Sequence, residues 1–135
     1  MTPDQSSGFV AAFNTIADEA YNTAKKSGWC DEKEQLLEIL RHYAPPLVEY
    51  ANTTIAASEM ALMHTELSEA LENLRLHSEP DDKIPEFTGV EAELADTIIR
   101  IMHVARARKW RVAEALVAKM AMNTGRPRKH GGKII

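Results

Sequence analysis

The sequence predicts an all-α fold, an antiparallel bundle of four or five helices that we expect to be oligomeric. Apolar residues recur at the three-and-four spacing of a helix through most of the 135 residues. No segment alternates with period two for long enough to form a convincing strand. Prolines and glycines fall between the periodic segments. We therefore expect a single domain that spans 1–135.

Five helical segments follow from these boundaries. They are expected at about 7–26, which Gly28 ends; at 31–44, which Pro45 ends; at 46–77, either as one helix or broken near 51–54; at 90–110; and at 111–123, which Gly125 and Pro127 end. The loop at 78–89 is polar and contains prolines and a glycine. A bundle this short leaves apolar faces uncovered, so a homodimer or homotetramer is expected.

The composition is that of an ordinary soluble globular protein, with 44% hydrophobic and 27% charged residues. No window approaches about 18 uncharged apolar residues, so neither a transmembrane helix nor a membrane partner is expected. The segment 1–10 lacks the basic start and the apolar core of a secretory signal. Cys30 is the only cysteine, which excludes an intramolecular disulfide and suits a cytoplasmic location.

Charge is distributed unevenly along the chain. Glu114 is the last acidic residue, and the 21 residues after it carry a charge of +5, which leaves −9 on the first 114 residues. This distribution differs from the basic face of a protein that binds a nucleic acid duplex. It suits a small polyanion held between a metal-loaded acidic site and a basic clamp. The alternative is a basic terminus that is simply solvated.

Two carboxylate pairs lie beside apolar stripes. Glu66 and Glu69 are one helical turn apart, and Glu93 and Asp96 repeat this spacing in a later segment. At about 100° per residue, each pair lies at the border of the apolar stripe on its helix, on the same edge. Glu72 points away from that edge and is expected at the surface. Two such helices packed antiparallel would bring four carboxylates together.

Four carboxylates in a small, partly dry space need a counter-charge. Mg²⁺ supplies it, because this cation takes oxygen ligands, keeps several waters and recruits phosphates, and Mn²⁺ is a possible substitute. The chemistry that such a site performs is metal-assisted phosphoryl transfer or hydrolysis. The alternative is a solvated carboxylate face on a non-catalytic helical interaction or regulatory module.

Three segments in order resemble a known family. "LMHTELSEALENLR", "EAELADTIIRIMHVA" and "KMAMNTGRPRKHGGK" are similar to the MazG-like all-α nucleoside triphosphate pyrophosphohydrolases, which carry E-x-x-E, E-x-x-D and K-x-x-x-N-x-x-R elements in this order. The resemblance covers roughly 57–133, with a motif core at about 57–123 and a basic tail at 124–135. It implies Mg²⁺-dependent hydrolysis of a (deoxy)nucleoside triphosphate to the monophosphate and pyrophosphate, as nucleotide-pool house-cleaning.

The resemblance also implies roles for individual residues. The implied Mg²⁺ ligands are Glu66, Glu69, Glu93 and Asp96, with catalytic work assigned to Glu66 and Glu69, of which one orients the attacking water. The implied contacts to phosphates or sugar are Lys119, Asn123 and Arg126. One departure is His103, which stands where many members have an acidic residue seven positions after the aspartate. It is expected as a metal ligand, as a supporting group beside the site, or as a surface histidine.

Three further residues are candidates for substrate binding. Arg100 lies one turn beyond Asp96 and is expected either to approach a phosphate or to pair with a carboxylate. Trp29 follows the helix-ending glycine and either stacks on a base or caps the core. Lys133 either closes over a triphosphate or belongs to a disordered tail.

Overall fold

The structure is a computed structural model, and it describes residues 1–126. Its elements are α1 (Pro3–Lys26), α2 (Asp31–Tyr43), the short 3₁₀ helix η1 (Pro45–Leu47), α3 (Val48–Arg75), α4 (Gly89–Arg108) and α5 (Val112–Thr124). No strand occurs within these residues, which confirms the all-α class. None of the helices in this part of the chain is both long and apolar enough for a membrane span.

The helix boundaries agree closely with the sequence pattern except at the start of α1. α1 begins at Pro3 rather than near residue 7, because Thr2 caps it: its hydroxyl accepts from the Gln5 N–H while the Gln5 side chain accepts from the Thr2 N–H. α3 runs without a break through 51–54, which settles the choice between one helix and two.

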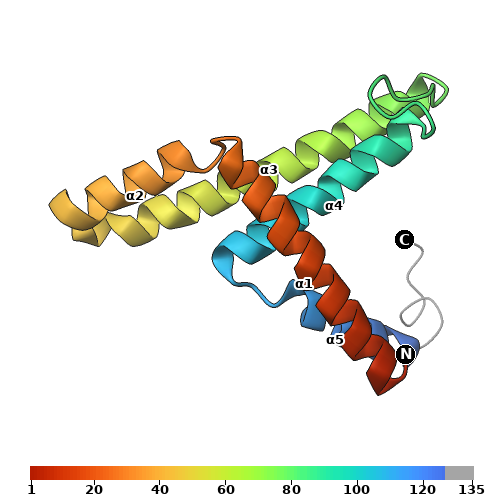
Figure 1. The fold of residues 1–135 in the computed structure, drawn as a ribbon, viewed down its shortest axis with the longest axis horizontal. Coiled ribbons are helices and arrows are strands. Elements are labelled where there is room, and N and C mark those ends of the chain that lie inside the picture. The colour runs from red at the N-terminus through yellow and green to blue at the C-terminus, as the bar shows by residue number, and fades with distance from the viewer. Residues whose placement is uncertain (127–135) are drawn as a thin grey trace.

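α3 and α4 form the central antiparallel pair, joined by the loop at 76–88 (Figure 1). α2 lies along the first part of α3, and α1 crosses the pair and packs mainly against α4. α5 packs against α1, near the end of α1 that lies away from the 76–88 loop. The five helices therefore pack against one another as a bundle in which α3 and α4 form an antiparallel hairpin.

The hydrophobic core lies where α1, α4 and α5 meet. Phe13 and Ala17 of α1, Met102 of α4 and Ala113 of α5 form its buried centre. No large side chain within 1–126 is fully buried, so this core is small for a chain of this length.

The α3–α4 hairpin does not bury the apolar stripes that the sequence predicts. The two helices face each other through small and polar side chains, while the bulky apolar side chains of the stripes are exposed. Buried on these two helices are Glu66, Ala70, Ala92 and Thr97; exposed are Leu67, Leu71, Leu74, Leu94 and Ile98. These five bulky side chains therefore lie outside the core of one chain.

Candidate functional site

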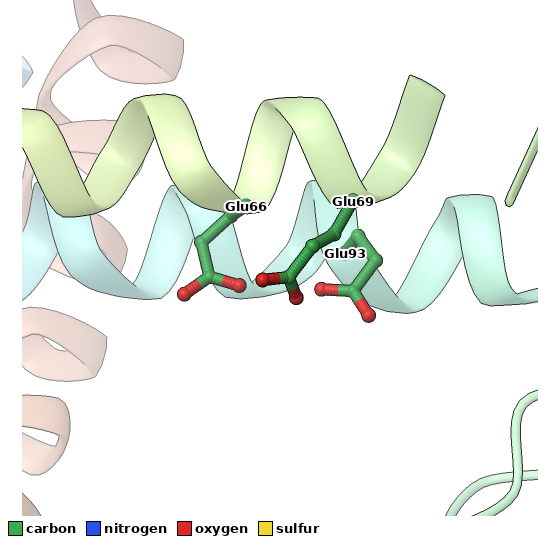
Figure 2. Close-up of side chains that lie close together, drawn as sticks. All are labelled: Glu66, Glu69 and Glu93. Atoms are coloured by element: carbon green, nitrogen blue, oxygen red, sulfur yellow. The ribbon is translucent and has the colours of Figure 1, made fainter. Parts of the chain in front are cut away.

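Three of the four predicted carboxylates converge. Glu66 and Glu69 of α3 and Glu93 of α4 each place a carboxylate oxygen within 4.8 Å of the others (Figure 2). Glu66 is buried, Glu93 is half-buried and Glu69 is exposed, so the cluster opens to solvent on one side. Residues far apart in the sequence therefore form one acidic group, which we name the carboxylate cluster.

The local structure at the start of α4 positions this cluster. Thr88 caps α4: its hydroxyl accepts from the Glu91 N–H, and the Glu91 carboxylate accepts from the Thr88 N–H. Gly89 lets the two helices approach closely, because a Cβ there would lie 2.3 Å from the Asn73 side chain of α3. Asn73 in turn donates to the carbonyl of Glu69 at 3.1 Å. The last turns of α3 and the first turns of α4 therefore approach each other closely beside the cluster.

The electrostatics of the cluster show a deficit of positive charge. Burial, the neighbouring carboxylate of Glu69 and hydrogen bonding to Glu66 raise the pKa of Glu93. The contacting cation is Arg100, whose Nε donates to Glu66. One guanidinium thus faces several carboxylates. The atoms that could coordinate a metal are carboxylate oxygens, which are the hard ligands that Mg²⁺ and Mn²⁺ prefer. The residues present therefore fit a divalent cation.

Asp96 lies beside the cluster rather than within it. It is exposed on α4 and lines the adjoining pocket together with Arg100. The sequence places it with the other three carboxylates, whereas the three converging groups are Glu66, Glu69 and Glu93. Glu72 is exposed and accepts from Arg75 at 3.0 Å, which confirms its surface position.

A pocket of about 490 Å³ adjoins the cluster. Its lining includes Trp29, Leu62, Asp96, Ile99, Arg100 and His103. Trp29 follows Gly28, whose φ of 82° ends α1, and its side chain is 73% exposed. The alternative that Trp29 caps the core is therefore wrong. Its exposed ring is accessible for stacking on a planar ligand. Arg100 lines the pocket and donates to Glu66 of the carboxylate cluster, so the two features are continuous.

His103 is half-buried against α1, and a plain surface position is excluded. Its ring lies 5.7 Å from that of Tyr21, measured between centroids. Its Nδ1 is buried and has no hydrogen-bond partner among the described residues. Burial and the nearby Lys33 lower the pKa of His103, although Glu59 and the carbonyl of Ala20 act in the opposite direction.

A network of ion pairs centred on Glu59 lines the end of the pocket away from the carboxylate cluster, and the sequence analysis missed it. Lys33 of α2 donates to Glu59 of α3 at 2.9 Å, and Arg108 of α4 donates to the same carboxylate through Nε and a terminal nitrogen at 3.0 and 2.9 Å. Burial alone would raise the pKa of Glu59, but these hydrogen bonds hold it below its usual value. The available signal was spacing: Glu59 lies seven residues, or two turns, before Glu66 on the same face.

Within residues 1–126, the side chains predicted to form the basic clamp do not lie beside the carboxylate cluster. Lys119 and Asn123 lie on α5, and Arg126 follows it. All three are exposed, and α5 lies away from the loop end of the α3–α4 hairpin (Figure 1). Within 1–126 no hydrogen bond or ion pair joins them to the carboxylate cluster. Lys133 lies outside the described residues.

Comparison with known proteins adds no relative from which a function can be transferred. The assignment of a function therefore rests on the geometry of the carboxylate cluster and its pocket, together with the three sequence motifs. No family model, no curated protein sequence and no solved structure matches the chain.

Proposed function

We propose that this protein is a Mg²⁺-dependent nucleoside triphosphate pyrophosphohydrolase that converts a (deoxy)nucleoside triphosphate to the monophosphate and pyrophosphate. Removal of unwanted nucleotides is the role that fits this reaction. The observation that carries the proposal is the convergence of Glu66, Glu69 and Glu93 from two helices. The order of the E-x-x-E and E-x-x-D motifs on those helices supports it further.

The four acidic residues divide the work of the site. Glu66, Glu69 and Glu93 would hold Mg²⁺, and Asp96 lies one turn beyond Glu93, at the boundary between the cluster and the pocket. When bound there, Mg²⁺ would neutralise the charge that grows on the phosphate oxygens and would lower the pKa of a water molecule. Glu69 is the most exposed member of the cluster, so its carboxylate is best placed to orient the attacking water.

Arg100 has two roles in this account. Without a divalent cation its guanidinium is the counter-charge of Glu66. Once a cation takes over that role, the guanidinium is free to contact a phosphate, for which its planar set of donors is well suited. The position of Arg100 between the cluster and the pocket supports this second contact.

The remaining substrate contacts come from outside the cluster. Trp29 offers an exposed aromatic face at the pocket mouth for a nucleobase. The expected phosphate contacts of Lys119, Asn123 and Arg126 require a second copy of the chain to bring its α5 to the site, which agrees with the proposed homo-oligomer.

A panel of nucleotides tests the proposed reaction. The protein is incubated with Mg²⁺ and each common deoxynucleoside and ribonucleoside triphosphate, and pyrophosphate is measured. We expect release from at least one of them, a loss of about 100-fold or more in Glu69→Gln and Asp96→Asn, and unchanged release in the control Glu72→Gln. No release across the panel, or equal release by wild type and Glu69→Gln, contradicts the proposal.

A second candidate function is a non-catalytic helical interaction or regulatory module. The exposed leucines and isoleucine of the α3–α4 hairpin favour it, because such a face suits a partner helix. A protein of this kind would show neither Mg²⁺ binding nor turnover in the same panel.

A further inference from the structure

The turn at 27–30 between α1 and α2 brings Trp29 to the wall of the pocket. Gly28, with a φ of 82°, and the Trp29 N–H, which donates to the carbonyl of Ala24 at 3.0 Å, set the path of the backbone. The Trp29 side chain itself is 73% exposed, so packing inside the protein holds it only weakly. The position of the ring beside the pocket therefore depends on how the turn is held against the rest of the molecule.

Ion pairs fix the start of α2, the helix that follows this turn. α2 lies along the first part of α3 (Figure 1), and none of its residues is buried within the part of the chain that the structure describes. Lys33, in the first turn of α2, donates to Glu59 of α3 at 2.9 Å. The neighbouring Glu34 accepts from Lys25 of α1 at 3.0 Å. One pair thus ties the start of α2 to α3, and the other ties it to the end of α1.

The two pairs differ in burial. The side chains of Glu59 and Lys33 are 9% and 38% exposed. Those of Lys25 and Glu34 are 50% and 51% exposed, so water and salt screen this second pair more strongly. Lys33 and Glu59 also line the same pocket as Trp29. The Lys33–Glu59 pair is therefore the stronger hold on the turn, and it lies at the pocket itself.

Glu59 keeps a second cation when Lys33 is removed. Arg108 of α4 donates to the Glu59 carboxylate through Nε and a terminal nitrogen at 3.0 and 2.9 Å. A buried carboxylate without any cation is strongly destabilising, but Glu59 would remain paired with α4. The network thus separates two roles, because Arg108 joins α3 to α4 and Lys33 joins α2 to both. A neutral residue at position 33 should loosen the turn without unfolding the α3–α4 hairpin.

We propose that Lys33 is a positioning residue for nucleotide binding: its ion pair with Glu59 holds the 27–30 turn so that the Trp29 ring stacks on the nucleobase of the triphosphate. The inference rests on the proposed pyrophosphohydrolase function and on the base contact assigned to Trp29, and it adds the group that orders this contact. Stacking on an ordered ring gains more than stacking on a mobile one, because the mobile ring must first lose conformational freedom. Since Lys33 donates to Glu59 and not to the carboxylate cluster, its effect falls on binding rather than on the chemical step.

The first test measures kcat and KM for the triphosphate that the protein hydrolyses best. Lys33→Met should raise KM about fivefold and leave kcat within twofold, whereas Lys33→Arg should keep KM within twofold of wild type because it retains the ion pair. Trp29→Leu should raise KM about tenfold, and Lys33→Met added to it should change KM by no more than about twofold. Lys25→Met is the matched control, since it breaks the exposed pair on the other side of the turn, and it should leave KM within twofold of wild type.

The second test uses nucleosides alone, so it does not depend on turnover. Trp110→Phe leaves Trp29 as the only tryptophan, and its fluorescence is titrated with each of the four deoxynucleosides. We expect saturable quenching by at least one of them, weakened about fivefold when Lys33→Met is added and unchanged when Lys25→Met is added. Trp110→Phe itself should leave hydrolysis within twofold of wild type, because Trp110 lies outside this pocket and phenylalanine keeps a ring beside Arg108.

The outcomes separate the two proposals. Equal KM in wild type and Lys33→Met, or equal quenching with and without Lys33→Met, overturns the role of Lys33 and leaves the pyrophosphohydrolase standing. An effect of Lys33→Met on KM that persists in Trp29→Leu shows that Lys33 contacts the substrate itself, and it also overturns the positioning role. An absence of saturable quenching by any deoxynucleoside overturns the base contact and this inference with it. Quenching that depends on Lys33, without hydrolysis of any triphosphate, supports the positioning role and overturns the proposed reaction.

Discussion

Glu93 is the residue whose pKa shows the repulsion among the clustered carboxylates. Its pKa is raised by burial and by Glu69 and Glu66, so the folded protein binds a proton there more tightly than the unfolded chain does. Without a divalent cation, this group contributes stability at low pH that is lost as pH rises from about the ordinary glutamate pKa through the raised value.

Replacement of Glu93 should therefore stabilise the cation-free protein at neutral pH. In EDTA at pH 7 we expect Glu93→Gln to unfold at a higher temperature than wild type, and the difference should shrink as pH falls toward 4.5. Added Mg²⁺ should raise the unfolding temperature of wild type and not that of Glu93→Gln. Thermal unfolding followed by circular dichroism measures both effects, and a lower unfolding temperature for the variant at every pH would contradict the assignment.

Glu59 presents the opposite case, a buried carboxylate with more than one cation. Removing its charge leaves the nearly buried Arg108, and the more exposed Lys33, without their carboxylate partner. We expect Glu59→Gln to lower the free energy of unfolding by about 3 kcal/mol. The control Glu72→Gln, on the same helix, loses only an exposed pair with Arg75 and should cost less than about 0.5 kcal/mol. Urea unfolding measures both, and equal costs would show that the network adds nothing.

At the scale of helices, the cap of α4 connects local structure to the site. Thr88→Ala removes the hydroxyl that accepts from the Glu91 N–H, at the start of the helix that carries Glu93. We expect a loss of about 1 kcal/mol in unfolding free energy and weaker Mn²⁺ binding, because the first turn of α4 loosens. Thr54→Ala is the control, since Thr54 is exposed on α3 and its hydroxyl only donates to the carbonyl of Tyr50 in the same helix. Unchanged stability in Thr88→Ala would contradict the capping role.

Helices were the part of the fold that the sequence predicted best. Periodicity, caps and breakers are local signals, so all five segments were predicted close to their observed positions. The carboxylate cluster was also accessible, because an antiparallel pair with matching edges brings Glu66, Glu69 and Glu93 together. Spacing placed Glu59 on the face of Glu66, but its ion partners and the setting of His103 were not predictable, since they depend on how α2 reaches α3 and how α1 crosses α4.

The predicted apolar stripes show the limit of the same reasoning. A helical pattern identifies an apolar face but does not say what covers it. Leu71 and Ile98 belong to those stripes, yet they are 58% and 52% exposed. Within one chain, the helices instead meet along the edges that hold Glu66 and Ala70.

At the scale of the whole molecule, the proposed second copy of the chain would cover the exposed stripes. At about 100° per residue, Leu67, Leu71 and Leu74 lie opposite Glu69 on α3, and Leu94 and Ile98 lie opposite Asp96 on α4. In an antiparallel hairpin both stripes then form one face, on the side away from the carboxylates. Two copies related by a two-fold axis would each cover this face of the other. Because the core of one chain is small, burying this face would add stability that one chain lacks.

Charged substitutions on that face test the assembly. We expect wild type to be a dimer or tetramer by size-exclusion chromatography with light scattering, and Leu71→Asp with Ile98→Asp to shift it to the monomer and reduce hydrolysis. Ile39→Asp is the control, because Ile39 is comparably exposed but lies on α2. A monomeric wild type, or an equal effect of Ile39→Asp, would contradict a homo-oligomer formed through this face.

Binding of a divalent cation tests the central claim most directly. Mn²⁺ is titrated into the cation-free protein, and the free ion is followed by its electron paramagnetic resonance signal for wild type, Glu69→Gln and Glu72→Gln. We predict saturable binding by wild type and Glu72→Gln, and binding weakened at least about tenfold in Glu69→Gln, which removes one carboxylate of the cluster. No binding by wild type, or equal binding by all three proteins, would contradict the account.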